Sequence, residues 1–256
     1  MQGLTSEEKG FRLIVTGRAG TGRTVLVALL AHLFAMQGIE VLAVDADPEQ
    51  GLAASLGLPL ARQQYENAVE EQHTASTDTL LHLGPTISGT LESHVIRIAE
   101  HLNLCMTGDV EEIGHPGFEG AIHEFIRINQ GVVLLDTLAG VEHLARAVKE
   151  GFSRALVVAD PSQSALSVAL RAATFARALG IGDIHLVVNQ VCGETDLEEV
   201  GRAVGPCHLF TTITYLSYDE GVHQVWPTVT PLLREETAFM AGVRGICRVL
   251  SQIGQR

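Results

Sequence analysis

The chain has 256 residues, of which 46% are hydrophobic and 18% are charged, and this is enough apolar sequence to bury one large core. Its formal net charge is −13 and the sequence shows no basic stripe, which argues against nucleic acid and anionic lipid as partners. The first ten residues carry no apolar run, and the most apolar stretch, residues 25–36, is too short to span a bilayer. We therefore expect one domain over residues 1–256, located in the cytoplasm, with no membrane insertion.

Short apolar runs alternate along the chain with longer helical patterns. The runs are nearly continuous, which indicates strands buried on both faces, and their alternation with helices predicts a three-layer α/β fold with a mostly parallel central sheet covered by helices on both faces. Ligands of such sheets bind beyond the carboxyl ends of the strands. The expected strands cover residues 11–16, 41–44, 102–106, 132–135, 155–159, 185–189 and 212–216. The expected helices cover residues 23–36, 119–128, 141–150, 165–179 and 235–253.

Two further segments bear on this organisation. Residues 62–79 are polar and show no hydrophobic pattern, so we expect either an insertion or a surface segment there. The last expected helix places five apolar side chains on one stripe, and we expect them to pack on the sheet and not on a membrane. These side chains are Phe239, Val243, Ile246, Leu250 and Ile253.

The first expected strand is followed by Gly17-Arg-Ala-Gly-Thr-Gly-Arg-Thr24 and then by an apolar helix. Glycines let the backbone curl so that several N–H groups face one phosphate cluster, and the helix adds its positive N-terminal end. Gly17, Gly22 and Thr24 match the spacing of the GxxxxGK[ST] phosphate loop, whose hydroxyl ligates Mg²⁺. A Rossmann dinucleotide site requires GxGxxG, and GRAGTG lacks its second glycine; a plain tight turn is the other alternative. The segment therefore predicts phosphate binding.

Arg23 stands where this loop carries lysine. A guanidinium is a wide planar fork that pairs two phosphate oxygens, but it does not fit the small volume that an ammonium occupies. Only Lys9 and Lys149 among the 17 basic residues are lysines, so part of this exchange reflects composition. We expect nucleotide binding to survive the exchange more readily than fast hydrolysis.

The second expected strand ends in Asp45-Ala-Asp47-Pro. Two carboxylates at positions i and i+2 of an extended segment point the same way. Facing a phosphate loop, one would hold the Mg²⁺ shell and the other would orient an attacking water. An acidic turn closed by proline is the alternative.

Two later strands also end in polar side chains. Asp136 directly follows a buried apolar run, a position that suits a carboxylate contacting Mg²⁺ through water. Gly140 permits a loop that senses the γ-phosphate. Asp136 as a helix N-cap is the alternative. Asn189 ends another strand, where its amide would pair with the edge of adenine.

These four segments, in this order, resemble the MinD/ParA/nitrogenase-iron-protein group of deviant-Walker ATPases. That group carries KGGxGKT, a strand ending in DxD, a strand ending in Dxx(A/G)G and an adenine-binding Asn. The resemblance covers nearly the whole chain and implies a P-loop NTPase fold, ATP or ADP with Mg²⁺ as cofactors, and a homodimer formed on nucleotide. The matching residues are Arg18, Gly20, Gly22, Arg23, Thr24, Asp45, Asp47, Asp136, Gly140 and Asn189.

Within the group, the segment DTLAGVEHLAR at 136–146 is similar to the D-x-E-A-G-x-E-H-x-x-R signature of the CooC-type accessory ATPases. Asp-Pro-Ser at 160–162 and Tyr-Asp-Glu at 218–220 are also similar to that branch. Members of the branch help to insert nickel into carbon monoxide dehydrogenase. The resemblance thus implies a partner metalloenzyme, or its assembly proteins.

The chain departs from the family pattern at three places. Arg23 and Arg18 replace the P-loop lysine and the signature lysine that reaches the partner's nucleotide. The family's metal-binding CxC is absent, because residues 107–120 contain no cysteine. His115 with Glu111, Glu112 or Glu119 offers a harder site for a divalent metal; an exposed polar loop is the simpler interpretation.

The resemblance then assigns roles residue by residue, with Arg18 acting across the dimer. The expected catalytic residues are Arg18, Arg23, Asp47 and Asp136. The expected nucleotide contacts are Gly17, Ala19, Gly20, Thr21, Gly22, Arg23, Thr24, Val25, Asp45, Gly140 and Asn189. The expected Mg²⁺ ligands are Thr24, Asp47 and Asp136. Two functions remain open: a Mg²⁺-dependent ATPase that assists maturation of a metalloenzyme, and a nucleotide-binding regulatory or scaffold protein with little turnover.

Overall fold

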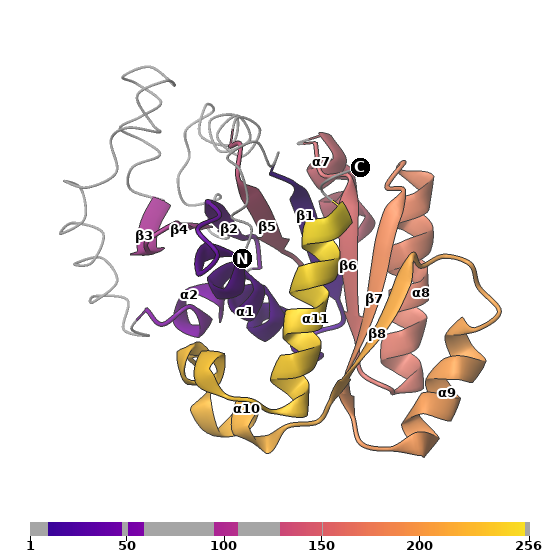
Figure 1. Ribbon diagram of the computed structural model, residues 1–256. Helices are drawn as coiled ribbons and strands as arrows, with labels where there is room; N and C mark the ends of the chain where they lie inside the picture. The colour runs from indigo at the N-terminus through magenta and orange to yellow at the C-terminus, as the bar shows by residue number, and fades with distance from the viewer. Residues whose placement is uncertain (1–9, 48–50, 59–94, 107–128, 150, 254–256) are drawn as a thin grey trace.

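The computed structural model describes residues 10–47, 51–58, 95–106, 129–149 and 151–253, which form a central sheet with helices on both faces (Figure 1). The strands are β1 (Arg12–Gly17), β2 (Val41–Asp45), β3 (Val95–Ala99), β4 (Leu102–Met106), β5 (Val132–Asp136), β6 (Arg154–Ala159), β7 (Asp183–Val191) and β8 (Thr212–Ser217). The helices are α1 (Arg23–Ala35), α2 (Gly51–Ser55), α7 (Val141–Lys149), α8 (Gln163–Ala178), α9 (Glu194–Val204), α10 (Glu220–Val225), the 3₁₀ helix η2 (Thr230–Arg234) and α11 (Ala238–Ile253).

The strand order of the sheet brings the ends of distant segments together. The order is β3-β4-β2-β5-β1-β6-β7-β8, and neighbouring strands run parallel except for β3, which is antiparallel to β4. The chain leaves β1 for β2 on one side and later enters β6 on the other, so the end of β1 lies where the connections diverge. Open α/β sheets bind their ligands at such points. In the β2–β5 register, Asp45 pairs with Asp136 at this edge.

Alternate residues of each strand contribute to two separate cores, one on each face of the sheet. Leu13 and Val15 of β1 belong to the core formed with α1 and α11, whereas Ile14 belongs to the core formed with α7 and α8. Burial on both faces is the reason that the strand segments are continuously apolar. The predicted three-layer α/β fold with a mostly parallel sheet is therefore confirmed.

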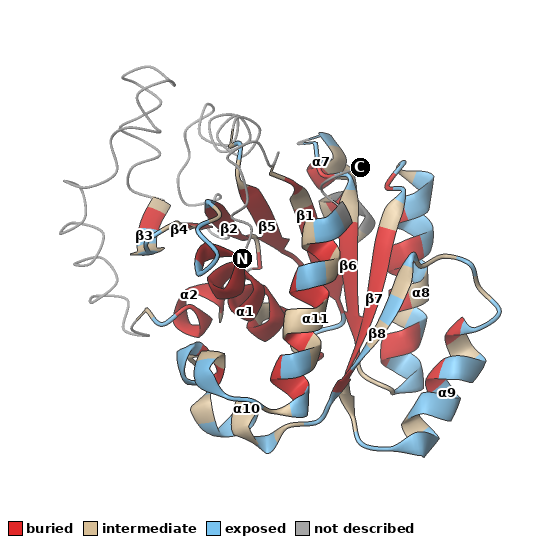
Figure 2. Cartoon of the chain, viewed as in Figure 1, coloured by how far each residue is buried: buried red, intermediate tan, exposed pale blue. Residues whose placement is uncertain are grey.

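Helix α1 is buried on almost all sides (Figure 2). It contacts the sheet, α2, η2 and α11, and the ring of Phe34 packs edge-on against that of Phe11 with centroids 5.6 Å apart. A helix that is apolar all round belongs inside a core, and RTVLVALLAHLFA has this character. The turn before α1 is thus held on a firmly packed support.

The seven strands expected from the sequence are all present, each within two residues at either end. Strand β3 was not predicted, because it lies at the edge and buries only Ile96 among its five residues, which leaves no clear hydrophobic pattern. Helix α9 was missed for a similar reason, since its buried residues are Val200 and Val204. The short helices α2 and α10 were also missed. The expected helix at 119–128, the loop at 107–120 and the segment at 62–79 lie outside the described residues.

Helix α11 begins at Ala238 and not at residue 235, because the backbone is extended at Glu235, directly after η2. Phe239, Val243, Ile246 and Leu250 are buried in the core shared with α1, so the predicted packing of this stripe is confirmed for these four residues. No helix in the described part of the chain combines the length and the apolar character needed to cross a membrane.

Candidate functional site

The turn between β1 and α1 has a backbone that only glycine accommodates at two positions. Gly22, the N-cap of α1, has φ 87°, and a Cβ there would collide with the side-chain amide of Asn189. Gly17 ends β1 with φ 153°, and a Cβ would collide with the backbone carbonyl of Val158 on β6. The glycine spacing read from the sequence thus follows from close backbone approach.

Polar side chains fasten this loop to the neighbouring strands. The hydroxyl of Thr21 lies 2.8 Å from the carbonyl of Arg18 and 3.3 Å from the carbonyl of Val158, so its one proton is shared between the loop and β6. The amides of Asn189 and Gln190, on β7, donate to the carbonyls of Thr21 at 3.0 Å and Gly20 at 3.3 Å. Because Gly22 has no side chain to cap α1, the amides of its first turn are left for another partner, and a helix N-terminus of this kind suits an anion.

Asp45 is completely buried at the end of β2 and organises the segment that follows it. Its carboxylate accepts from the backbone N–H of Asp47 at 3.1 Å and of Leu52 at 3.0 Å. Burial, followed by repulsion from Asp136, raises the pKa of Asp45 to about 7. Asp45 therefore positions the Asp47 backbone and the start of α2; its direct contact with nucleotide stays a prediction.

Asp136 is also completely buried and lies beside the first turn of α1. Its Oδ2 accepts from the hydroxyl of Thr24 at 2.6 Å. Burial raises the pKa of Asp136, whereas Arg23 and the Thr24 hydroxyl lower it. Its Oδ1 is buried with no hydrogen-bond partner among the described residues, although Arg23 Nη1 lies 3.7 Å away. Carboxylate and hydroxyl oxygens are the ligands that Mg²⁺ takes, so Thr24, Asp136 and the nearby Asp47 fit this ion.

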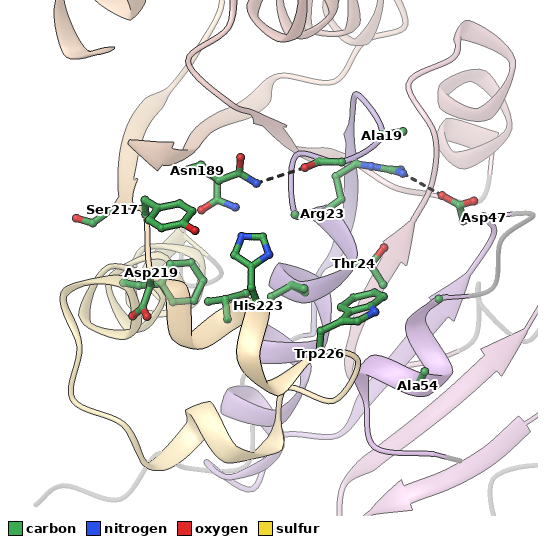
Figure 3. A pocket seen from close by; sticks show the side chains of 18 of the residues that line it. Ala19, Arg23, Thr24, Asp47, Ala54, Asn189, Ser217, Asp219, His223 and Trp226 are labelled. Atoms are coloured by element: carbon green, nitrogen blue, oxygen red, sulfur yellow. Dashed lines mark hydrogen bonds and ion pairs between the residues drawn. The ribbon is translucent and has the colours of Figure 1, made fainter. Parts of the chain in front are cut away.

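Arg23 lies across the site, and its side chain is buried (Figure 3). Its Nη2 forms an ion pair with Asp47 Oδ2 at 2.9 Å, and its Nη1 donates to the backbone carbonyl of Thr137. The sequence indicated Arg23 as a phosphate ligand and Asp47 as a separate acid. The structure joins the two residues.

The loop, the helix start and the strand ends border one pocket of about 650 Å³, a size usual for small-ligand sites. In Figure 3, His223 and Trp226 extend from the side of α10 toward Arg23 and Thr24. The pocket-lining residues that had been predicted are Ala19, Gly20, Gly22, Arg23, Thr24, Val25, Asp47 and Asn189. The lining residues that sequence reasoning missed include Gly51, Ala54, Leu138, Gln190, Val222, His223, Trp226 and Phe239. Tyr218 and Asp219 also line it, and the Tyr-Asp-Glu segment was their signal.

Other predicted site residues, Asp45 and Asp136 among them, do not line the pocket. Within the loop, Gly17 and Thr21 are buried. Arg18 is exposed and donates to the hydroxyl of Ser164 at the start of α8, at 3.1 Å. Gly140 directly precedes α7, and its carbonyl accepts from the N–H of Leu144. Cys105 is buried, and the described residues hold no group of three or more His, Cys, Asp or Glu able to bind a metal.

A glycine loop at the divergence point of a doubly covered parallel sheet, with acidic strand ends beside it, is the arrangement of the P-loop NTPases. Comparison with known families agrees with this class. Residues 13–254 match the CobQ/CobB/MinD/ParA nucleotide binding domain, and the chain belongs to this family.

Similar proteins are found both by sequence and by structure. The carbon monoxide dehydrogenase accessory protein CooC of Rhodospirillum rubrum is 26% identical over 227 residues, which are 82% of this chain and 85% of that protein. An uncharacterised ATP-binding protein of Methanocaldococcus jannaschii is 27% identical over 230 residues, 82% of this chain and 86% of that protein. Among solved structures, the septum site-determining protein MinD of Pyrococcus horikoshii, complexed with Mg-ADP, has a TM-score of 0.66 at 17% identity and covers 95% of this chain and 96% of that one.

Proposed function

We propose that the chain binds ATP and ADP together with Mg²⁺ in the pocket beside the P-loop and hydrolyses ATP slowly. The observation that carries this proposal is the convergence of the glycine loop, the uncapped start of α1 and Asp47 on one pocket, with the buried Asp136 hydrogen-bonded to Thr24 of its lining. Family membership and the ATP-binding relatives support the same ligand.

In this proposal the loop amides and Arg23 hold the phosphates, and Asn189 would pair with the edge of the base. Thr24 and Asp136 would hold Mg²⁺, with Asp47 nearby. The ion would neutralise charge on the phosphate oxygens. Asp47 accepts a hydrogen bond from the attacking water and orients it. Arg18, which is exposed, would reach the nucleotide of a second copy when two chains dimerise on nucleotide.

We further propose that the chain assists the maturation of a partner metalloenzyme in the cytoplasm. The support is the CooC relative, whose name describes an accessory protein of carbon monoxide dehydrogenase. Elemental analysis of the purified protein and light scattering with and without ATP test this proposal. A chain that stays monomeric with ATP and never carries stoichiometric nickel or zinc would count against it.

A specific observation also favours the second candidate, a nucleotide-binding regulatory protein with little turnover. The Arg23–Asp47 ion pair holds the residue that would orient water. Steady-state phosphate release by the wild-type protein and by Asp47→Ala separates the two candidates. Turnover that Asp47→Ala abolishes supports the ATPase, whereas ADP binding without any turnover supports the regulatory protein.

A further inference from the structure

The buried guanidinium of Arg23 connects the ends of β2 and β5. Only 5% of its side chain is exposed, and Asp47, its partner at 2.9 Å, is 9% exposed. The other terminal nitrogen donates to the Thr137 carbonyl and lies 3.7 Å from Asp136. A guanidinium presents its donors in a rigid planar fork, so both terminal nitrogens of this side chain are directed at the acidic strand ends together.

The proposed function requires both members of this ion pair to act elsewhere. Phosphate binding needs the guanidinium to face the loop, and hydrolysis needs the Asp47 carboxylate to face a water. Charge-assisted hydrogen bonds are about twice as strong as neutral ones, so a phosphate and a carboxylate are comparable partners for the same fork. An ammonium, which is a compact point charge, does not join Asp47 and the Thr137 carbonyl in one plane.

We propose that Arg23 exchanges its partner, from Asp47 in the empty site to the nucleotide's phosphates in the loaded site. This inference rests on the proposed function. Asp47 then competes with phosphate for the guanidinium, and phosphate binding releases the carboxylate for its work on water. Arg23 is thereby the residue that couples occupancy of the loop to the availability of Asp47, and its competition weakens nucleotide affinity.

The partner exchange has a consequence that simple charge repulsion lacks. If simple repulsion of phosphate by the carboxylate were the whole effect, neutralising Asp47 would improve anion binding equally with and without Arg23. Under partner exchange the improvement depends on Arg23, because the gain comes from releasing its guanidinium. A double-mutant cycle measures this dependence directly.

The experiment is isothermal titration with pyrophosphate and with ADP, in EDTA so that Mg²⁺ ligation by Asp47 does not enter. Asp47→Asn should tighten binding about tenfold, the difference between a charged and a neutral hydrogen-bond partner. In the Arg23→Gln background the same substitution should change affinity less than about twofold. Asp160→Asn, which neutralises a carboxylate directly after strand β6 on the other side of β1, is the matched control and should also change it less than about twofold.

Equal gains in both backgrounds, or no gain from Asp47→Asn, would overturn the partner exchange while leaving the proposed function intact. Failure of the wild-type protein and every variant to bind either probe would overturn both. Thermal unfolding is measured first for each variant. If Asp47→Asn does not fold, Asp47→Ser, which keeps an acceptor without the charge, carries the same expectation.

Discussion

Replacing Arg23 by Gln removes the cation that lies beside two buried carboxylates. Its guanidinium pairs with Asp47 at 2.9 Å and lies 3.7 Å from Asp136, which is completely buried. Removing one partner of a buried ion pair costs about 3–5 kcal/mol, since the other charge loses the opposite charge that compensates its burial. For a chain of this length, that loss lowers the melting temperature by roughly 10 °C.

The loss should depend on pH. Arg23 lowers the pKa of Asp136, which burial raises, so the variant's folded state has a still higher pKa at this residue. An acid whose pKa is raised on folding stabilises the protein below its unfolded pKa and loses that stability as pH rises through the folded value. Arg23→Gln should therefore be least stable relative to wild type at pH 8 and closer to it at pH 5.

Urea unfolding of the metal-free protein at both pH values measures these differences. Arg23→Gln/Asp47→Asn serves as the control, because it neutralises the carboxylate along with the cation and should recover part of the loss. An Arg23→Gln protein as stable as wild type at pH 8, or a loss that is the same at pH 5, would refute the role of Arg23 as the charge that stabilises this cluster.

Three other changes have definite expected results. Gly22→Ala introduces a Cβ at φ 87° that collides with Asn189, so it should destabilise the protein by about 1–3 kcal/mol in urea unfolding and abolish ADP binding; unchanged ADP affinity would contradict the loop geometry. Asn189→Ala leaves the Thr21 carbonyl without its side-chain donor at 3.0 Å and should cost about 1–3 kcal/mol, with weaker ADP binding by calorimetry; a neutral effect on both would contradict this role. Burial lowers the pKa of His32 below its ordinary value of 6.5, so at falling pH the unfolded chain takes up a proton at this residue before the folded chain does. The stability of the wild-type protein should therefore fall as pH drops below 6.5, and that of His32→Gln should fall less steeply. Identical pH profiles of the two proteins in urea unfolding would exclude His32 as the cause.

The fold was predictable because its strands carry a strong and simple pattern. Segments such as VLAVD of β2 and VVLLD of β5 are buried at every position, and a short, continuous apolar run is typical of a strand that helices cover on both faces. Where burial is one-sided the pattern failed. Helix α9 and strand β3 each bury one or two side chains, and propensity alone does not separate them from loops.

The site was predictable where it follows strand ends in sequence. The glycine loop, Asp47, Asp136 and Asn189 meet at one edge because parallel strands direct their carboxyl ends there. The pairing of Arg23 with Asp47 was not predictable, since it depends on how one long side chain is oriented within a buried cluster. The Tyr-Asp-Glu segment pointed to Tyr218 and Asp219, but His223 and Trp226 were missed. They belong to α10 and the residue after it, and this helix has no buried residues and therefore no hydrophobic pattern.

Calorimetric titration of the wild-type protein with Mg-ADP, beside Gly22→Ala, tests phosphate binding by the loop most directly. We predict saturable binding of one nucleotide per chain, lost in Gly22→Ala while circular dichroism of the variant remains that of a folded protein. An absence of binding heat with ADP, ATP and GTP alike, or equal affinity in the variant, would contradict the assignment of the P-loop pocket as a nucleotide site.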